Sequence, residues 1–314
     1  MSPSRSSVLE ERVRRLAADL DLPHPGEGHT AERWRALAAV ARHDVTEARV
    51  IEAHVDAASI LHEAGLEPEP GALYGVWAAE EPGRALDLTD ERVRGHKPFC
   101  TGTGIVDRAL VTARTDTGIV LAEIDARHPS IEYDTDDWLT PAFAATGTAT
   151  ATLDTPTIRQ VGPVGWYLDR VGFWHGACGP AACWAGGVLG LIDQAVAAAA
   201  AKGAEPHLDA HVGALVAIGW ELAAMLDRAG DEIDADPDDR AAAIMRARIV
   251  RHLVDRAATE AIDRFGRALG PRPLIRDGDV IRRIAEVQLY VRQCHAERDL
   301  AALGAAELDR ARSA

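Results

Sequence analysis

The chain has 314 residues, of which 47% are apolar and 26% are charged, as in ordinary soluble globular proteins. The formal net charge of −15 argues against a nucleic-acid partner, because phosphate binding needs a basic stripe and the sequence shows none. No stretch reads as a signal peptide or a membrane span, and the four cysteines form no CxxC pair. We therefore expect a cytoplasmic protein with no membrane partner.

The N-terminal part of the chain is helical in pattern. Residues 1–22 predict an amphipathic helix, and Thr30 is a suitable N-cap for a helix over 31–43. Asp44 has the spacing of a residue that opens a further helix, which is expected to stop at Gly65. These helices predict a short N-terminal helical domain.

The pattern changes after "EPEPG". Short alternating runs such as "IVDRALVTAR" and "TGIVLAEID" follow, separated by turn residues, with Gly118 at an expected hairpin. Helical periodicity then returns and predicts four helices, at about 177–201, 207–229, 238–267 and 279–303. Strands that do not alternate with helices predict an α+β fold rather than a doubly wound sheet. The predicted domains are 1–70, 71–165 and a four-helix bundle over 166–314.

One motif suggests a metal site. In "HGACGPAAC", His175, Cys178 and Cys183 supply three zinc ligands, but a structural zinc site needs four and no fourth follows at a suitable spacing. Small cysteines in a stretch rich in Gly and Ala are more often packing residues. We therefore expect no metal.

Several strings, in this order along the chain, resemble the acyl-CoA dehydrogenase superfamily of FAD flavoproteins. They are "WAAEEPG" (77–83), "GHKPFCTGTGIVDRALVTAR" (95–114), "RFGRALGPRPL" (264–274) and "IRRIAEVQLYVRQCHAERDLAALG" (281–304). The resemblance covers nearly the whole chain. It implies N-terminal helices, a central antiparallel β domain and a C-terminal four-helix bundle.

The resemblance also implies a flavin site, with FAD as the cofactor. Phe99 matches the aromatic residue that lies against the flavin ring, and Thr101 matches the residue near the polar rim of the ring. Phe265 belongs to the turn that receives the FAD pyrophosphate from a neighbouring subunit, and Arg298 matches an arginine that closes the last motif. The implied cofactor-binding residues are Phe99, Thr101, Gly102, Thr103, Phe265 and Arg298.

The sequence departs from the family pattern at two functional positions. The catalytic glutamate of the last helix should fall at Val291 or Arg292, and neither can abstract a proton. In the pyrophosphate turn, Arg267 replaces a glycine and Asp263 replaces a glutamine. A carboxylate beside a pyrophosphate is unfavourable, although a neighbouring arginine can offset it.

Two residues are candidates for the missing catalytic base. Asp169 lies in "LDR", which resembles the setting of the base in some relatives, and its alternative role is a helix cap or a surface ion pair. His295 lies one predicted turn before Asp299, which could orient it as a base; otherwise this polar stripe faces solvent. If the apolar seam over 284–301 is buried, Arg298 within it needs an anionic partner.

Three functions remain open on these grounds. The first is an FAD-dependent dehydrogenase that oxidises an acyl-CoA or acyl-carrier thioester by passing a hydride to the flavin. The second is a flavin-dependent monooxygenase on the same fold. The third is a non-catalytic relative that pairs with an active subunit. The dehydrogenase reading is preferred, and a homodimer or homotetramer, possibly with a related subunit, is expected, with the seam over 284–301 as its interface.

Overall fold

The computed structural model describes residues 5–203 and 205–313, which group into two compact units. The barrel unit comprises Met1–Leu22 and Arg49–Phe173, and the helical unit comprises Pro23–Ala48 and Trp174–Ala314. The N-terminal helices are therefore divided between the two units rather than grouped with one another. The predicted three-domain division stays a prediction.

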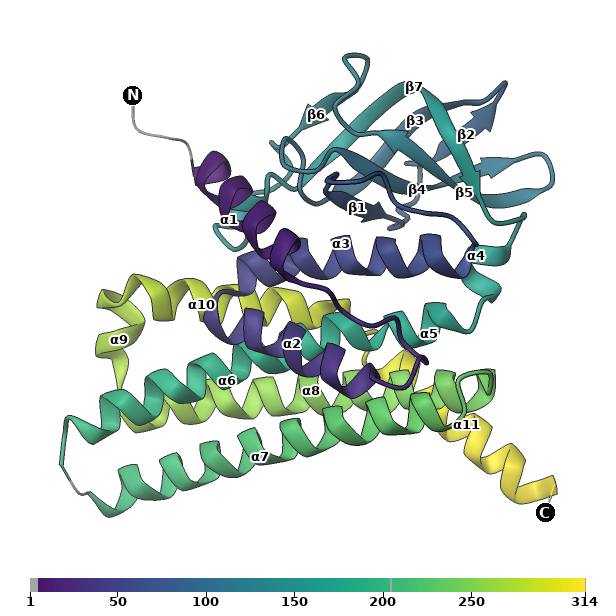
Figure 1. The fold of residues 1–314 in the computed structure, drawn as a ribbon. Helices are drawn as coiled ribbons and strands as arrows, with labels where there is room; N and C mark the ends of the chain where they lie inside the picture. Colours follow the sequence, from purple (N-terminus) through teal and green to yellow (C-terminus); the bar gives the residue numbers. More distant parts are fainter. Residues whose placement is uncertain (1–4, 204, 314) are drawn as a thin grey trace. The chain divides into compact units, whose positions relative to one another are not determined.

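The barrel unit contains seven strands and three of the helices of the described chain, α1, most of α3 and α4 (Figure 1). The strands are β1 Tyr74–Trp77, β2 Leu86–Thr89, β3 Arg92–Cys100, β4 Arg108–Thr115, β5 Gly118–Asp125, β6 Glu132–Asp134 and β7 Ala149–Val161. The helices are α1 Arg5–Asp19, α3 Val45–Glu63 and α4 Trp166–Asp169. The predicted hairpin is confirmed, since β4 and β5 join at Gly118.

Five strands close into a barrel. The pairings run β4–β2–β3–β7–β5 and return from β5 to β4, while β1 adds to β4 and β6 adds to β7. All seven strands lie within the predicted β segment, but their pairing is not wholly antiparallel as expected, because β4 pairs in parallel with both β1 and β2. Closure pairs each of the five barrel strands on both sides, so the barrel is complete without a further strand.

Helix α3 packs on the barrel through one apolar cluster. Ile60 and Leu61 of α3 meet Tyr74, Leu110 and Leu121 of the strands, and all five are fully buried. The helix begins where expected, because the Asp44 side chain accepts hydrogen bonds from the N–H groups of the first turn. It ends at Glu63, just before Gly65 with its left-handed backbone.

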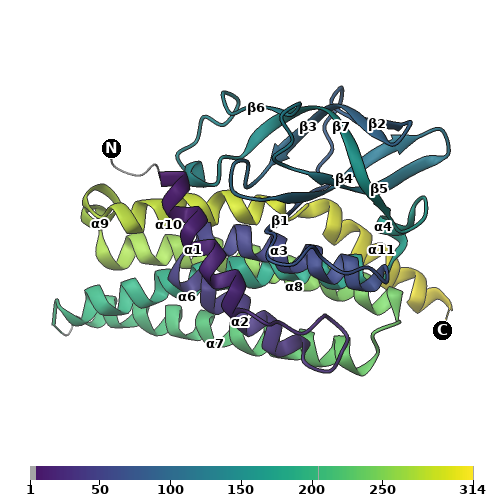
Figure 2. The same cartoon turned by 45° about the horizontal axis from the view of Figure 1, so that its top comes forward.

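The helical unit is built on three long helices that run side by side, with α2 packed across two of them (Figures 1 and 2). Its elements are α2 Thr30–His43, α5 Gly172–Gly176 in part, α6 Cys178–Ala200, α7 Pro206–Ala235, α8 Arg240–Leu269, α9 Pro271–Arg276, α10 Gly278–Tyr290, the 3₁₀ turn Val291–Gln293 and α11 Glu297–Ser313. Thr30 is not the predicted N-cap but the first helical residue, and its hydroxyl bonds to Asp234 at 2.6 Å.

Glycines in α6 allow its neighbours to approach closely. A Cβ atom at Gly186 would lie 2.2 Å from the carbonyl oxygen of Ala38 in α2, and one at Gly187 would lie 2.7 Å from the side chain of Val287 in α10. Helix α6 is buried over most of its length, and both Cys178 and Cys183 are buried in it as packing residues.

Two helices of the described chain are long and apolar enough to cross a membrane by length and composition alone. They are the stretch 172–200, with 67% of its most apolar window buried, and α7, with 22% buried. The first is the core helix of its unit. The second leaves an apolar face uncovered.

Candidate functional site

A bulge in β3 turns one aromatic side chain outward. The pairing of β3 with β7 shifts register between Lys97 and Cys100. Within the bulge, Phe99 has a φ of 57°, a left-handed backbone that is a genuine outlier for a bulky residue. Its side chain is 52% exposed, whereas Cys100 is fully buried in the barrel. Strain of this kind, which costs on the order of 1–3 kcal/mol, is typical of ligand sites.

Phe99 lines a cavity of about 290 Å³ in the barrel unit. The other lining residues are Glu81, Arg84, Asp134, Asp137, Trp138, Thr148, Ala149 and Thr150. Arg84 lies 3.0 Å from Asp137 and 3.2 Å from Glu81, so its charge is balanced within the wall. Two aromatic rings beside a polar rim form a site suited to one face of a planar ring system.

Thr101 joins this edge to a guanidinium group. The hydroxyl of Thr101 accepts a hydrogen bond from Arg49 at 3.1 Å and lies 3.1 Å from the hydroxyl of Thr148. The guanidinium carbon of Arg49 stacks 4.8 Å from the centre of the Phe143 ring. The carbonyl of Thr101 accepts from the indole N–H of Trp77 at 3.0 Å. A positive charge is thereby fixed beside the residue predicted to face the flavin rim.

Gly102 and Thr103 bond mainly within the protein. The N–H of Gly102 donates to the carbonyl of Thr146 at 2.9 Å, and the Thr103 hydroxyl donates to the carbonyl of Gly147. Gly102 has a φ of +86°, and a Cβ atom there would lie 2.9 Å from Val106. These two residues form the turn that holds Thr101 in place, and their predicted cofactor contacts stay a prediction.

The bulge is anchored from inside by a buried lysine. The Nζ atom of Lys97 lies 2.7 Å from Glu80 and 2.6 Å from the hydroxyl of Thr112. Burial lowers the pKa of Lys97 more than the carboxylate of Glu80 raises it. For Glu80, burial acts to raise the pKa, but the hydrogen bonds from Lys97 and Thr112 outweigh it and the pKa is lowered. Both pKa values fall because the ammonium group of Lys97 is buried, which disfavours its charged form, whereas the half-exposed carboxylate of Glu80 remains hydrated and accepts hydrogen bonds in its charged form.

The predicted base Asp169 lies away from this cavity. It is exposed at the end of α4, whose entry loop is fixed where Gly165 donates to the carbonyl of Ile119. This hydrogen bond lies near Val161, at the C-terminal end of β7. Cys100, the neighbour of Phe99, pairs instead with Ala149 at the N-terminal end of β7. The strand has 13 residues, a span of up to about 40 Å. A base must reach its proton within about 3.2 Å, so the barrel unit does not bring Asp169 to Phe99.

The last predicted helix is interrupted, which corrects the prediction of one helix over 279–303. Helix α10 ends at Tyr290, and α11 begins at Glu297 after a turn in which Ala296 has a φ of 43°. Two arginine contacts to α8 tether this turn, as Arg251 donates to the carbonyl of Gln293 and Arg292 pairs with Asp255.

The interruption changes the setting of His295 and Arg298. Arg298 is exposed at the start of α11, so it does not lie in a buried seam and needs no buried anionic partner. His295 remains beside Asp299, with its Nδ1 atom 3.8 Å from the carboxylate. Burial, followed by the charge of Arg298, lowers the pKa of His295. The imidazole is therefore neutral near pH 7 and able to accept a proton.

Phe265 is a core residue rather than part of a turn. It lies in α8, is 1% exposed, and is followed by helix as far as Leu269. Asp263 and Arg267 form an ion pair of 2.7 Å along the same helix. The N–H groups of this stretch are used in helical hydrogen bonds, so the pyrophosphate turn implied by the resemblance is absent here.

Sequence reasoning missed Arg49, Arg84 and Trp138. Arg49 lies 52 positions before Thr101 on a helix whose pattern shows only its core face. Trp138 lies in an acidic loop that predicts nothing but solvent exposure. The long-range packing of the barrel unit brings Arg49 of α3 to Thr101 and brings Arg84 and Trp138 to the cavity beside Phe99.

Comparison with known proteins identifies the fold. No protein-family model matches the chain, and no curated protein matches its sequence. Solved structures do match: dibenzothiophene monooxygenase TdsC from Paenibacillus sp. A11-2, solved with FMN and indole, superimposes with a TM-score of 0.76 at 15% identity, over 98% of this chain and 95% of that one. The chain has an acyl-CoA dehydrogenase-like fold.

Two other solved structures with this acyl-CoA dehydrogenase-like fold match as well. A nitrososynthase from Micromonospora carbonacea var. africana gives a TM-score of 0.76 at 18% identity, over 98% of this chain and 97% of that one. Butyryl-CoA dehydrogenase from Megasphaera elsdenii gives 0.75 at 14% identity, over 96% and 90%. Identities this low establish the shared fold and nothing finer.

Proposed function

We propose that this chain is a flavin-dependent oxidoreductase that holds its flavin ring against the edge formed by Phe99 and Thr101. The observation that carries the proposal is the strained, exposed Phe99 beside its cavity, because backbone strain that presents an aromatic ring to a cavity is typical of a ligand site. Arg49 would supply positive charge near the polar edge of the ring. A bound flavin supplies the redox chemistry, and the chain supplies orientation and electrostatics.

The cofactor that fits this chain is FMN rather than the FAD first expected. FAD carries an additional adenosine phosphate that needs N–H donors or cations, and the segment expected to provide them is uninterrupted helix from Arg240 to Leu269. Within that helix, Asp263 neutralises Arg267. TdsC, with the same fold, was solved with FMN.

The residues favour oxygen-dependent chemistry over dehydrogenation of an acyl thioester. Dehydrogenation needs a carboxylate base opposite the flavin, and Val291 and Arg292 occupy its expected place while Asp169 lies a strand length from Phe99. We therefore place a flavin-dependent monooxygenase first and the acyl-CoA dehydrogenase second.

Titration of the purified chain with FMN and with FAD tests the cofactor. We expect saturable binding of FMN, seen as a shift in the visible flavin spectrum, with an affinity at least tenfold higher than for FAD. Phe99→Ala should weaken FMN binding, because stacking on an aromatic side chain contributes about 1 kcal/mol. A chain that binds neither flavin would instead support the non-catalytic reading.

A second experiment distinguishes the monooxygenase from the dehydrogenase reaction. With reduced FMN from a separate reductase, a monooxygenase consumes oxygen in step with substrate oxidation. A dehydrogenase bleaches its bound flavin under anaerobic acyl-CoA. Bleaching by acyl-CoA would reverse the order given above.

Replacing Arg49 with glutamine is expected to weaken FMN binding about tenfold or more. Glutamine keeps a donor for Thr101 but removes the charge, and a hydrogen bond to a charged group contributes roughly 1.5–3 kcal/mol. Isothermal titration gives the dissociation constant. Arg15→Gln is the matched control, since that arginine pairs with Glu11 on the exposed face of α1. Equal affinities for Arg49→Gln and wild type would exclude Arg49 from the site.

A further inference from the structure

The cavity beside Phe99 has an unbalanced charge. Its lining contains three carboxylates, those of Glu81, Asp134 and Asp137, and one guanidinium, that of Arg84. Carboxylates with ordinary pKa values are ionised at neutral pH, so three negative charges stand against one positive charge. The other lining residues are neutral, and the lining therefore carries a net charge of −2.

The single cation of the lining is already engaged. The Nη1 atom of Arg84 lies 3.0 Å from Asp137 and 3.2 Å from Glu81, and it donates to the hydroxyl of Thr150 at 3.0 Å. Three acceptors thus hold the guanidinium against the wall. A ligand in the cavity meets a cation whose charge is satisfied, so an anionic ligand gains little from it.

One carboxylate of the lining is available to a ligand. Asp134 lies in β6, is exposed, and accepts a hydrogen bond from the N–H of Asp136 at 2.9 Å. In the part of the chain that the structure describes, it pairs with no arginine or lysine. Its charge can therefore be matched by a cation that the ligand brings.

Two aromatic rings complete the lining. The left-handed backbone of Phe99 presents its ring, and the indole N–H of Trp138 donates to the carbonyl of Ala142 at 2.9 Å, which fixes the second ring. The face of an aromatic ring attracts a cation, most strongly when the cation is an ammonium group that has lost part of its water. Aromatic faces and carboxylates in one small cavity favour an organic ammonium ligand.

The spacing of the acidic side chains does not suit a metal ion. Over residues 5–203 and 205–313, no three or more His, Cys, Asp or Glu side chains are placed to hold one. The carboxylates surround the cavity instead of converging on one point, so a larger cation is needed to reach them. The volume of about 290 Å³ lies at the lower end of the range for small-molecule sites and suits one ring with a short side chain.

We propose that this cavity binds the substrate, and that the substrate carries a protonated amine beside a planar group. This substrate class rests on the function proposed above, because Thr148 of the cavity lies 3.1 Å, hydroxyl to hydroxyl, from Thr101 at the flavin edge. The flavin would lie along Phe99, and the planar group of the substrate would lie against Trp138. The amine would point toward Asp134.

The same charges oppose an acyl-CoA. The phosphates of that substrate would meet a lining of net charge −2 on a chain of net charge −15. Like charges brought together disfavour binding and thereby exclude the wrong ligand. The cavity therefore discriminates between the two substrate classes on charge.

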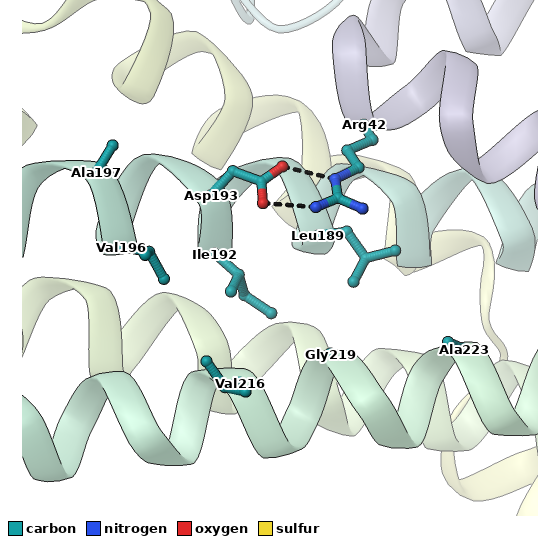
Figure 3. Close-up of a pocket in the computed structure, with 9 residues that line it drawn as sticks. All are labelled: Arg42, Leu189, Ile192, Asp193, Val196, Ala197, Val216, Gly219 and Ala223. Carbon is teal, nitrogen blue, oxygen red and sulfur yellow. Dashed lines mark hydrogen bonds and ion pairs between the residues drawn. The ribbon is translucent and has the colours of Figure 1, made fainter.

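A larger groove on the helical unit lacks this selectivity. It has a volume of about 490 Å³ and lies between α6 and α7. Its two charged residues, Arg42 and Asp193, pair with each other at 2.6 Å, and its other lining residues are apolar or glycine (Figure 3). The groove has no net charge with which to select a ligand, in contrast to the cavity of the barrel unit.

Isothermal titration of the FMN-loaded, full-length chain with three matched compounds tests the charge preference. Phenethylamine, phenethyl alcohol and hydrocinnamate share a phenyl ring and end in a cation, a neutral group and an anion. We expect the amine to bind at least about tenfold more tightly than the alcohol, because its ammonium group meets two ring faces and a negative lining. Hydrocinnamate should bind most weakly.

Substitution of Asp134 locates the effect. Asp134→Asn keeps an acceptor for the N–H of Asp136 but removes the charge, and it should lower the affinity for the amine about threefold, since exposed ion pairs contribute modestly. Its affinity for the alcohol should not change. Asp136→Asn is the matched control, because it makes the same charge change in the same loop outside the lining. Trp138→Leu keeps an apolar side chain without a ring face and should weaken the amine more than the alcohol.

Equal affinities for the three compounds, or no binding of any of them, would overturn the proposed substrate class. Equal losses from Asp134→Asn and Asp136→Asn would do the same, since the general charge of the loop would then account for the preference. The FMN affinity of each variant is measured first, so that a loss of flavin counts against the proposed function alone. If the wild type binds no FMN, the same three titrations on the flavin-free chain decide whether the cavity prefers a cation.

Discussion

Replacing Gly186 with alanine is expected to lower the free energy of unfolding of the helical unit by up to about 2 kcal/mol. The added Cβ would lie 2.2 Å from the carbonyl oxygen of Ala38 and 2.8 Å from its Cα. Both are backbone atoms of α2, so no side chain can rotate away and the two helices must separate. Overpacking of this kind costs about 1–3 kcal/mol, occasionally more. The higher helix propensity of alanine returns at most about 1 kcal/mol.

Urea unfolding followed by far-UV circular dichroism measures this effect, and the chain provides a matched control. Gly213 lies in α7, where an added Cβ would meet no heavy atom within 4 Å. Gly213→Ala should therefore stabilise the chain by up to about 1 kcal/mol through propensity alone. If the two substitutions changed stability equally, α2 and α6 would not cross as closely at Gly186 as the structure places them.

The sequence predicted the helices best where local chemistry sets their ends. Asp44 opens α3 and Gly65 follows its end, because a capping carboxylate and a left-handed glycine act on their own neighbours. The predicted helix over 279–303 failed because its interruption is not local. The turn before α11 is fixed by Arg251 and Asp255, which lie about 40 residues away on α8.

The same distinction applies to the candidate site. Phe99 and Thr101 were predicted from a string of adjacent residues, and the structure places both on one edge of the barrel. The cation beside Thr101 comes from Arg49, and no alternation or spacing links those two positions. Phe265 shows the opposite error, since a matching string was read as a turn where α8 continues as helix. A motif of adjacent residues therefore predicts which of them lie together, but long-range packing decides which other residues they contact.

The buried Lys97 has the second large expected effect, because it links three segments of the barrel unit. Its Nζ atom donates to the carboxylate of Glu80, the residue before Glu81 of the cavity lining. It also donates to the hydroxyl of Thr112 in β4 at 2.6 Å and to the carbonyl of Thr112 at 3.2 Å. Lys97→Ala is expected to destabilise the chain by about 3 kcal/mol, since it removes the buried donor to Thr112 and Glu80 and leaves a cavity behind. Glu80 is 43% exposed and can hydrate, which keeps the cost below that of an isolated buried charge.

The stability lost on replacing Lys97 with alanine should depend on pH, in a direction set by the pKa of Glu80. The pKa of Glu80 is lowered in the folded chain, so its ionised form contributes stability that is fully present above about pH 4.5 and is lost as the pH falls through the lowered value. The stability difference between wild type and Lys97→Ala, from urea unfolding between about pH 3 and pH 7, should therefore be largest at pH 7 and narrow in acid. Glu80→Gln, which keeps an acceptor for Lys97 but not the charge, should flatten this dependence. A difference that stayed constant with pH would mean that Lys97 acts through its volume alone and that its ion pair with Glu80 contributes nothing.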